Sequence, residues 1–589
     1  LSFIALKCRD VQTLMPVMEP VMNDGSYEGA IVLPPKCAFY ADNPIACNDY
    51  SSLYPSCMIS ENISHDSKVW TQEFDLDGNM KKQGGNAMFD NLKGYKYVNI
   101  EYDTYEWKRL GGEKSKEQKI KVGTKICRYA QFPDDKKAIM PSVLKELLAS
   151  RKATRKLIKY KTVTDENGET YTGLMSKNDE YTIIIESNGD IVDIPNEMVV
   201  SIKDTYNDFM KNVFDKRQSS IKVVANSLYG QCGARTSSFY EKDIAASTTA
   251  MGRKALLYAK DVIETVYEHR ICDTKYGKVK TRAECIYGDT DSVFFTFNLE
   301  DLDGNKIRGK KALDITIDLA VEAGELATKF LKAPHDLEYE KTFMPFLLLS
   351  KKRYVGMLHE FDINKGKRKS MGIVLKRRDN APIVKDVYGG IIDILMSTHN
   401  VSESINFTKK CLQQIVDEKY PLEKLIISKS LRGFYKNPDS IAHKVLADRI
   451  TKRDPGNKPA VGSRIPYIYI QTKGKVKLQG DKIENPDYIR KNKIKPDYSF
   501  YITNQIMKPV QQIYGLLLYD IPQFKRKVRM FKKKIAKLEK EYSNDPKKFK
   551  VKSEKIIYEE VKKIIFQEYL LTCDRIKTGQ KSLFNYFVT

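Results

Sequence analysis

An acidic motif near the middle of the chain has the residue types needed to bind a metal ion. The segment YGDTDS places Asp289 and Asp291 two residues apart. On a strand or tight turn, carboxylates at this spacing project to the same side, where their repulsion raises a pKa unless a cation lies between them. Mg²⁺ is suited to such a site, because it accepts one or two carboxylates together with water and phosphate oxygens. An isolated DxD string also occurs in solvated turns, so this motif alone leaves both interpretations open.

A second group of polar residues has helical spacing and a positive charge. Its members follow one another at intervals of three or four residues: Gln218, Lys222, Asn226 and then Tyr229 or Gly230. This spacing places them on one face of a helix. Earlier in the chain, Arg151 and Arg155 are also four residues apart. Two antiparallel helices that present these cations to each other would form a phosphate clamp, and the alternative is an ordinary solvated face.

A third group, in the segment NDYSSLYPS, combines a carboxylate with an aromatic residue at the start of a helix. It contains Asp49, Ser52, Leu53, Tyr54 and Pro55. By itself this segment is compatible with the end of an ordinary strand. Together with the other two groups, it would add a third carboxylate to a metal site and a flat wall beside it.

The elements that must position these groups can be predicted from periodicity. Residues 141–160 and about 204–229 have helical patterns, and two hairpin signals between them, at 165–168 and 187–190, predict a small β insertion. The pattern of residues 284–297 predicts two short strands that meet at the acidic turn. From about residue 384 onward, helical and loop segments alternate. The length of the chain predicts several domains, and the α+β class is what the family resemblance described below implies.

Composition narrows the class of protein. The 589 residues carry a net charge of +24, which excludes an acidic scaffold and favours a polyanionic partner, nucleic acid ahead of a membrane surface. The densest charge run, 525–540, predicts a helix with one apolar stripe, whose basic face is either simply solvated or contacts phosphate. Ten cysteines without a CxxC pair or zinc-ligand spacing argue against a disulfide framework and a zinc module, and they indicate a reducing compartment. No apolar run is long enough to span a bilayer.

In combination, these motifs resemble the polymerase core of family B DNA polymerases. DYSSLYPS, KVVANSLYG and YGDTDS resemble the family's first, second and third polymerase motifs, in the required order. The resemblance continues through seven further segments and covers nearly the whole chain: IAASTTAMGRKAL, LEYEK, KKRY, KRRDNAP, SKSL, GSRIPY and PDYSFYITNQI.

The resemblance implies a right-hand architecture. It comprises a palm built on an antiparallel sheet, fingers formed by a helical hairpin with a β insertion, and a mostly helical thumb. The implied boundaries are 1–45 for a remnant of the amino-terminal or exonuclease side, 46–138 and 231–378 for the palm, 139–230 for the fingers, 379–572 for the thumb and 573–589 for a tail.

The resemblance also implies roles for the three groups in two-metal nucleotidyl transfer. Asp49 and Asp291 would hold two Mg²⁺ ions, with Asp289 as a supporting carboxylate. The implied dNTP-binding residues are Arg151, Arg155, Lys222, Asn226, Tyr54, Ser52 and Leu53. Tyr54 would exclude a ribose 2′ hydroxyl by a steric clash, and Tyr229 with Gly230 would lie beside the nascent base pair.

Further implied contacts lie outside these groups. Primer-template DNA would be bound by six residues that need not read its sequence: Lys351, Lys352, Arg353, Tyr354, Arg377 and Arg378. Glu338 and Glu340 match acidic positions that bind a third metal in some relatives, and an exposed acidic strand end explains them equally well.

The chain departs from the family pattern at both ends. Only 48 residues precede Asp49 and they contain no exonuclease motif, so we expect a chain without proofreading whose amino-terminal region is truncated or supplied by another polypeptide. Truncation is favoured because the chain begins with Leu1. The end of the chain, QKSLFNYF, matches the motif that binds a PCNA-type sliding clamp through four residues: Gln580, Leu583, Tyr586 and Phe587. A terminal segment that docks on the thumb is the alternative.

Several features together resemble polymerases of large eukaryotic DNA viruses. These are the lack of paired cysteine modules, the β insertion and the segment SENISHDS. The resemblance implies viral genome replication inside the cell, in the host nucleus or a cytoplasmic viral factory. A non-catalytic DNA-binding scaffold with the same fold is the alternative, against which the intact carboxylates argue. Tyr54 and the DTDS motif argue against a reverse transcriptase or RNA polymerase.

Overall fold

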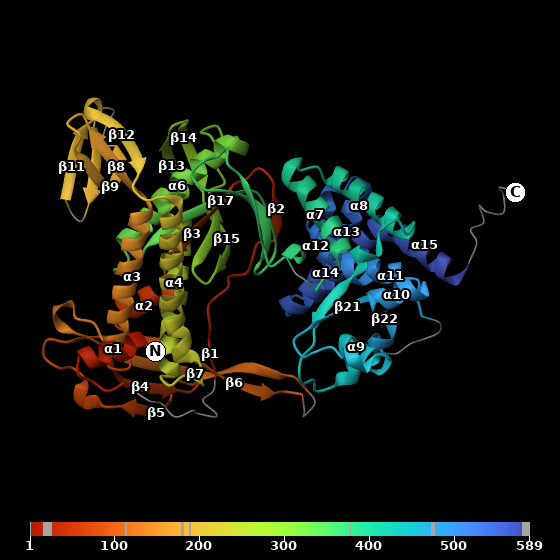
Figure 1. Ribbon diagram of the computed structural model, residues 1–589, viewed down its shortest axis with the longest axis horizontal. Helices are drawn as coiled ribbons and strands as arrows, with labels where there is room; N and C mark the ends of the chain where they lie inside the picture. The colour runs from red at the N-terminus through yellow and green to blue at the C-terminus, as the bar shows by residue number, and fades with distance from the viewer. Residues whose placement is uncertain are drawn as a thin grey trace.

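The computed structural model describes residues 2–15, 26–111, 115–177, 182–187, 190–376, 379–472 and 478–579. It contains helices and antiparallel sheets grouped in several units, so the predicted α+β multidomain class is confirmed (Figure 1). Within these residues, every helix is too short or too polar to cross a lipid bilayer.

A seven-stranded antiparallel sheet lies at the centre of the molecule. Its main strand order is β15-β16-β3-β17-β18-β19, and β2 pairs with β17. The strands are β2 (Ala38–Tyr40), β3 (Ile45–Tyr50), β15 (Glu284–Asp289), β16 (Ser292–Thr296), β17 (Leu337–Ser350), β18 (Arg353–His359) and β19 (Lys367–Met371). The strand pair predicted at 284–297 is therefore confirmed.

At β16 both faces of this sheet are buried, which explains the nearly continuous apolar run in this strand. Val293 and Phe295 belong to a core that includes side chains of helices α5 (Lys242–Val266) and α6 (Gly309–Lys329). Phe294, between them, points to the other face and packs with an aromatic cluster. The alternation follows from the period of two along a strand.

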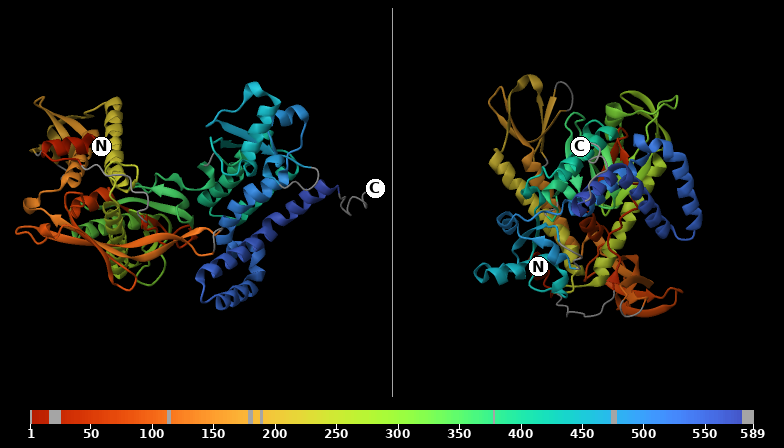
Figure 2. Two further views of the ribbon diagram at one scale, coloured as in Figure 1. Left: turned by 90° about the horizontal axis from the view of Figure 1, so that it is seen from below. Right: turned by 90° about the vertical axis from the view of Figure 1, so that its right-hand side faces the viewer.

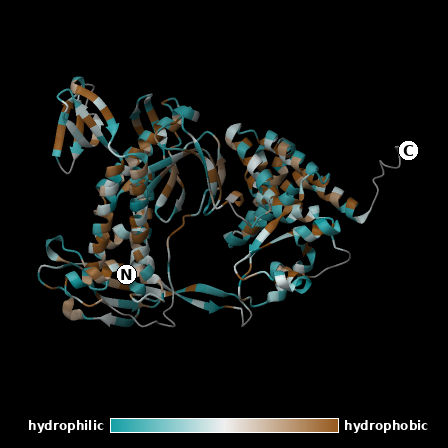
Figure 3. Ribbon diagram, in the orientation of Figure 1, coloured by the Kyte–Doolittle hydropathy of each residue, from teal (hydrophilic) through white to brown (hydrophobic). Residues whose placement is uncertain are grey.

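Two long helices stand side by side next to the sheet, as predicted. They are α3 (Ile139–Ile158) and α4 (Asp208–Gly233), and along both of them apolar residues recur between polar ones (Figure 3). The second helix begins at Asp208 rather than near residue 204, because β12 (Val199–Asp204) is still part of the insertion. The Asn207 side chain accepts a hydrogen bond from the Met210 N–H and caps α4.

The β insertion between these helices forms a sheet of its own with the order β11-β10-β9-β8-β12. It lies beyond one end of the helix pair (Figure 1). Its remaining strands are β8 (Tyr160–Asp165), β9 (Thr170–Lys177), β10 (Thr182–Ser187) and β11 (Asp190–Pro195). The hairpin β8–β9 turns at residues 165–168 as expected, whereas residues 188 and 189 of the second hairpin signal lie outside the described residues.

A second five-stranded sheet, with the order β1-β6-β7-β4-β5, lies at the other end of the helix pair (Figures 1 and 2). Its strands and two flanking helices are β1 (Ser26–Tyr27), β4 (Lys68–Phe74), β5 (Met80–Gly85), β6 (Lys96–Arg109), β7 (Glu117–Gln131), α1 (Ser2–Asp10) and α2 (Leu53–Ser60). Residues of this sheet share a core with α1 to α5. A separate two-stranded sheet of β13 (Glu268–Thr274) and β14 (Gly277–Arg282) contributes to the core that contains side chains of α5 and α6.

The elements from α7 onward gather into a mostly helical body, as the alternating pattern predicted (Figure 2). Its helices and strands are α7 (Pro382–Ser397), α8 (Val401–Val416), α9 (Ala442–Arg453), α10 (Pro486–Asn492), α11 (Tyr498–Phe500), α12 (Met507–Leu516), α13 (Val528–Glu541), α14 (Pro546–Val561), α15 (Gln567–Thr578), β20 (Ile427–Ser430), β21 (Arg464–Tyr469) and β22 (Ile483–Glu484). In α13, Phe531 is buried and Val528 and Ile535 pack beside it, which confirms the predicted apolar stripe.

Candidate active site

Asp49 lies near the end of the central strand β3, which pairs with β16 on one side and with β17 on the other. In the strand register it lies opposite Ser292 of β16 and opposite Glu338 of β17. The Ser292 hydroxyl donates a 2.7 Å hydrogen bond to Oδ1 of Asp49. Because the neighbouring strands fix the backbone, this carboxylate is positioned before any ligand binds. Ser292 was missed by the sequence analysis as a functional residue, although it completes the motif YGDTDS.

Asp291 lies at the corner of the β15–β16 hairpin, next to the end of β3. Thr290 adopts a left-handed conformation with φ of 63°, and the backbone N–H of Tyr50 donates to the Asp291 carbonyl. Asp291 lines the same cavity as Asp49. The hairpin thus joins two carboxylates that are far apart in the sequence.

Asp289 does not share this cavity, which corrects the expectation that it projects to the same side as Asp291. Its carboxylate pairs with Nζ of Lys352 at 3.0 Å and accepts a hydrogen bond from the Tyr287 hydroxyl at 2.9 Å. The i, i+2 rule holds within a strand, and here the strand ends at Asp289, so that Thr290 and Asp291 form the turn.

The electrostatics of the two cavity carboxylates favour a bound cation. Burial, with repulsion from Asp49 as the next cause, raises the pKa of Asp291 to about 6. Burial also raises the pKa of Asp49, although the Ser292 hydrogen bond opposes this effect. No group of three or more metal-ligating side chains occurs in the part of the chain that the structure describes. Two carboxylates nevertheless fit Mg²⁺, which takes its remaining ligands from water and phosphate oxygens.

The cavity has a volume of about 380 Å³, and cationic side chains of the two long helices face the carboxylates across it. Four of the predicted dNTP-binding residues line this side: Arg151, Arg155, Lys222 and Asn226. Lys222 lies close enough to oppose the rise in pKa of both carboxylates. Nε of Arg151 donates a 3.3 Å hydrogen bond to Gln218, which links α3 to α4. The structure therefore brings the predicted phosphate clamp and the carboxylates together.

The start of helix α2 forms another part of the wall. Ser52 is in the left-handed region, with φ of 55°, and together with Leu53 it lines the cavity. The Oγ atom of Ser52 is buried and has no hydrogen-bond partner. The first N–H groups of a helix lack intrahelical acceptors and carry a partial positive charge, so this end of α2 can bind a phosphate oxygen.

Tyr54 lies on α2, and its ring contacts the ring of Tyr229 on α4. Their ring centroids are 4.5 Å apart and the rings are tilted by 45°. Behind Tyr54 is Gly252 of α5, where an added Cβ would lie 2.8 Å from Cε1 of the ring. The sequence analysis did not single out Gly252, because its role depends on a contact between distant helices. Gly230, the other predicted base-pair contact, is exposed on α4.

Glu338 and Glu340 both line the cavity from β17. Burial and the neighbouring Asp336 raise the pKa of Glu338. Glu340 forms an ion pair with Lys341, a residue that also lies near Asp49 and that the sequence analysis did not assign to the site. The two acidic residues are therefore placed at the site, but one of them already has a cationic partner.

The predicted DNA-binding residues differ in how far their side chains are exposed. Lys351 and Lys352 are exposed in the turn between β17 and β18, and Arg353 is half-buried. Tyr354 is only 9% exposed and its ring packs against Phe294 in the sheet core, and its contact with DNA stays a prediction. Two sets of predicted residues lie outside the described residues: Arg377 and Arg378, and the clamp-motif residues Gln580, Leu583, Tyr586 and Phe587.

The fold and site lead to a family assignment. The profile of DNA polymerase family B matches residues 2–174 and 173–517, and the chain belongs to this family. The resemblance found in the sequence is therefore confirmed.

Among similar proteins, viral DNA polymerases are prominent. The chain is 45% identical over 591 residues to a DNA polymerase of Pyramimonas orientalis virus, covering all of this chain and 46% of that protein. It is 49% identical over 352 residues to that of Phaeocystis pouchetii virus, covering 59% of this chain and 29% of that one. For Acanthamoeba polyphaga mimivirus the identity is 46% over 248 residues, with 41% and 14% covered. The predicted likeness to polymerases of large DNA viruses is confirmed, and the chain spans less than half the length of these relatives.

Proposed function

We propose that this chain is the catalytic core of a DNA-templated DNA polymerase that extends a primer 3′ hydroxyl with dNTPs. The observation that supports it best is the joint placement of Asp49, Asp291 and Lys222 in one cavity. These residues come from three distant segments, and each matches a motif of the family to which the chain belongs.

We assign the structural units to the parts of a right hand. The central sheet with α5 and α6 would be the palm (46–138 and 231–378), and the helix pair with its β insertion would be the fingers (139–230). The helical body would be the thumb (379–572). Residues 1–45 would border an amino-terminal region and 573–589 would form a tail.

The metal proposed for this site is Mg²⁺, two ions of which would be held mainly by Asp49 and Asp291. When bound, the metal lowers the pKa of the primer hydroxyl and neutralises charge on the phosphates. We assign Asp289 a supporting role, in which its ion pair with Lys352 ties the hairpin to the β17–β18 turn. A third metal at Glu338 and Glu340 stays a prediction.

The reaction joins the primer 3′ oxygen to the α-phosphorus of the dNTP and breaks the bond from that phosphorus to the β-phosphate bridge oxygen. Pyrophosphate leaves, and the hydroxyl proton is released to water. Lys222, Arg151 and Arg155 would bind the triphosphate together with the amino-terminal end of α2, which stabilises charge that develops on the phosphates. Asn226 would add a neutral hydrogen bond.

Tyr54 would select the sugar. Its ring is wedged between Tyr229 and Gly252, so it cannot retreat when a ribose 2′ hydroxyl approaches. Discrimination then arises from a steric clash. Tyr229 and Gly230 would contact the nascent base pair from the fingers.

Closure of the fingers would complete the site. Lys222 and Arg155 are exposed and form no ion pair with another described residue, so a bound triphosphate would supply their missing partner. Such closure links catalysis to the fit of the incoming base pair.

The partners proposed are primer-template DNA, dNTPs and a PCNA-type clamp. Lys351, Lys352 and Arg353, with Arg377 and Arg378, would contact DNA. The residues 580–589 would bind the clamp, and deleting them should abolish stimulation of synthesis by a clamp while leaving distributive synthesis intact. The proposed setting is viral genome replication, in the host nucleus or a cytoplasmic factory.

Primer extension tests the central proposal. The 589-residue chain is incubated with a primed DNA template, dNTPs and Mg²⁺, beside Asp291→Ala and with Asp303→Ala, an exposed turn residue, as the matched control. We expect extension by the wild type and the control, and a loss of at least about 10³-fold in Asp291→Ala. DNA binding without extension by the wild type would favour the non-catalytic scaffold instead.

A further inference from the structure

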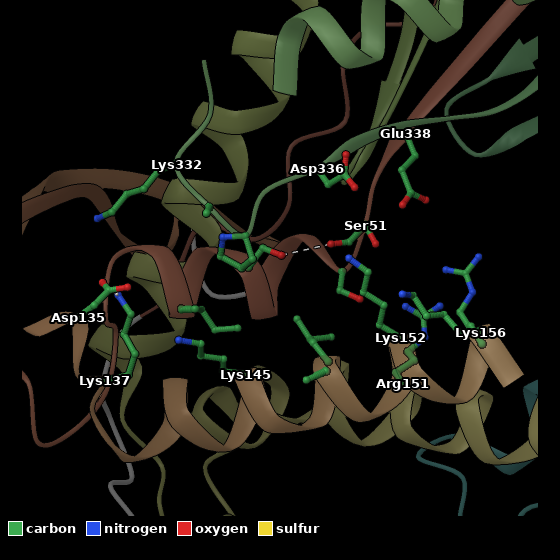
Figure 4. A pocket seen from close by; sticks show the side chains of 18 of the residues that line it. Ser51, Asp135, Lys137, Lys145, Arg151, Lys152, Lys156, Lys332, Asp336 and Glu338 are labelled. Carbon is green, nitrogen blue, oxygen red and sulfur yellow. Dashed lines mark hydrogen bonds and ion pairs between the residues drawn. The ribbon is translucent and has the colours of Figure 1, made fainter. Parts of the chain in front are cut away.

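A second cavity, drawn in Figure 4, adjoins the cavity that Asp49 and Asp291 line, which we call the catalytic cavity; neither of these two carboxylates lines the second one. Its volume is about 630 Å³, and α3 forms its floor, while its other wall comes from α2 and the segment 332–338. The two cavities share five lining residues: Ser51, Ser52, Arg151, Arg155 and Glu338. We call this second cavity the lysine pocket.

The lining of the lysine pocket is strongly cationic. Of the described residues that line it, eight are Lys or Arg and three are acidic. Four of the lysines follow α3 and its last turn at intervals of seven, four and three residues, which places them along one side of the helix: Lys145, Lys152, Lys156 and Lys159.

Several of these cations have no acidic partner. Lys137, Lys156 and Lys332 each form an ion pair, with Asp135, Glu186 and Glu61 respectively. By contrast, Lys145, Lys152 and Lys159 form no ion pair with any described residue.

Like charges on neighbouring helical turns repel each other, and a pocket lined by them concentrates anions. Asp336 and Glu338 on the opposite wall balance only part of this charge (Figure 4). A small multivalent anion would relieve the repulsion among the unpaired lysines.

The neutral part of the lining argues against a nucleotide as the occupant. Among the described residues, none that lines the lysine pocket is aromatic, whereas Tyr50, Tyr54 and Tyr339 line the catalytic cavity. A base would therefore find no stacking partner beyond Arg151 and Arg155, but a phosphate chain would find cations on that side.

We propose that the lysine pocket binds inorganic pyrophosphate after it leaves the catalytic cavity. Once the bond between the α-phosphorus and its bridge oxygen to the β-phosphate has broken, pyrophosphate passes Arg151 and Arg155 and pairs with Lys152 and Lys159. This inference rests on the proposed polymerase function. It adds to that function a product site that is separate from the binding site of the incoming triphosphate.

The test uses a double variant, Lys152→Gln with Lys159→Gln. The matched control is Lys216→Gln with Arg217→Gln, which removes the same charge from exposed positions on α4 outside both cavities. Equilibrium binding of radiolabelled inorganic pyrophosphate to the full chain, without DNA or dNTP, is measured first. The KM for pyrophosphate in primer pyrophosphorolysis and the KM for dNTP in extension follow.

We expect the dissociation constant of pyrophosphate to rise about tenfold in the pocket variant, because two partly exposed ion pairs with the ligand are lost. The control variant should show little change. The KM for pyrophosphate should rise by several times more than the KM for dNTP. Unchanged binding in the pocket variant, an equal loss in the control, or an equal rise in both KM values would overturn the proposal. So would a loss of DNA binding in place of pyrophosphate binding, which would mark the pocket as a path for a nucleic-acid strand.

The binding measurement requires no catalysis, so it separates the two proposals. Absence of primer extension by the wild type, with pocket-dependent pyrophosphate binding, would contradict the polymerase function and leave the anion site standing. Primer extension by the wild type, with pyrophosphate binding that is unchanged in the pocket variant, would support the polymerase function and contradict the anion site.

Discussion

The two sides of the proposed catalytic cavity are built differently. Asp49 lies between two neighbouring strands and accepts a hydrogen bond from Ser292, and Asp291 is fixed by the hairpin turn beside it. Lys222 and Arg155 instead project from exposed stretches of a helix pair and form no ion pair with described residues. The carboxylate side is therefore ordered by the fold, while the cationic side needs an anion to hold its side chains.

This difference has an energetic reason. Two carboxylates that are close together and partly buried repel each other, so only a rigid sheet keeps them there without a metal. Long cationic side chains lose rotamer entropy when they are held in place, and exposed ones gain little from surface ion pairs. Changes on the helix side should thus affect substrate binding and catalysis, whereas changes on the sheet side should also affect stability.

The largest effect in this comparison is expected for Lys222→Ala. If Lys222 binds the triphosphate as proposed, its loss should lower kcat/KM for dNTP by about 10²–10³-fold, because its charge would stabilise the phosphates during transfer. Single-nucleotide incorporation kinetics measure the effect, with Lys216→Ala on the same helix as control. A decrease of less than about fivefold would show that Lys222 does not contact the substrate.

Tyr54→Ala should reduce discrimination against ribonucleotides by about a hundredfold, since the steric block to a 2′ hydroxyl is removed. Tyr54→Phe keeps the ring and should retain the selectivity of the wild type. The ratio of kcat/KM for dNTP and rNTP is the measurement. Equal selectivity in all three proteins would remove Tyr54 as the sugar gate.

Gly252→Ala should raise the KM for dNTP roughly fivefold, because the added Cβ displaces the Tyr54 ring. In a Tyr54→Ala background the same change should have little effect, since the clashing ring is absent. This double-mutant cycle tests whether the contact between α5 and α2 transmits the effect. Additive effects would assign Gly252 a role independent of Tyr54.

An effect on stability rather than on kinetics is expected on the sheet side. The pKa of Asp291 is raised to about 6 in the folded chain, so the native state binds this proton more tightly than the unfolded state. The free energy of unfolding therefore falls as pH rises through this range, and the full cost is present above it. Without metal, Asp291→Asn should increase the stability at pH 7.5 by about 1–2 kcal/mol.

At acidic pH this gain should shrink to a minor part of its value, and it vanishes only below the unfolded-state pKa of about 3.9, where the wild-type carboxyl is protonated in both states. Thermal unfolding in EDTA at pH 7.5 and near pH 4.5 gives both values, with Asp303→Asn as the exposed control. A stability difference that does not depend on pH would contradict the electrostatic explanation.

Local patterns predicted most of the elements that carry the site. The helices at 141–160 and 204–229 and the strand pair at 284–297 were found with small changes in their bounds. These elements have strong periodicity, which depends only on nearby residues. The start of α4 was misplaced because residues 199–204 pair with β8, a long-range contact that local spacing cannot reveal.

Packing between distant segments determined the positions that sequence reasoning missed. Tyr354 follows three basic residues, and its burial depends on an aromatic cluster drawn from other strands. Gly252 and Lys341 are ordinary residues in their own segments, and they matter because α5 and β17 place them beside Tyr54 and Asp49. Such contacts carry no signal in the spacing of one segment.

The sequence by itself determined the chemical groups of this protein: two carboxylates in one motif, a third in another, and a helical ladder of cations. The types of these residues and their short-range spacing can be read from the chain, and together with the family resemblance they indicate metal and phosphate binding. Tertiary structure alone decided that Asp49 meets Asp291 while Asp289 pairs with Lys352, and that the lysines of α3 line a second cavity. The physical reason is that strand register and helix packing bring together residues hundreds of positions apart, and charge acts through space.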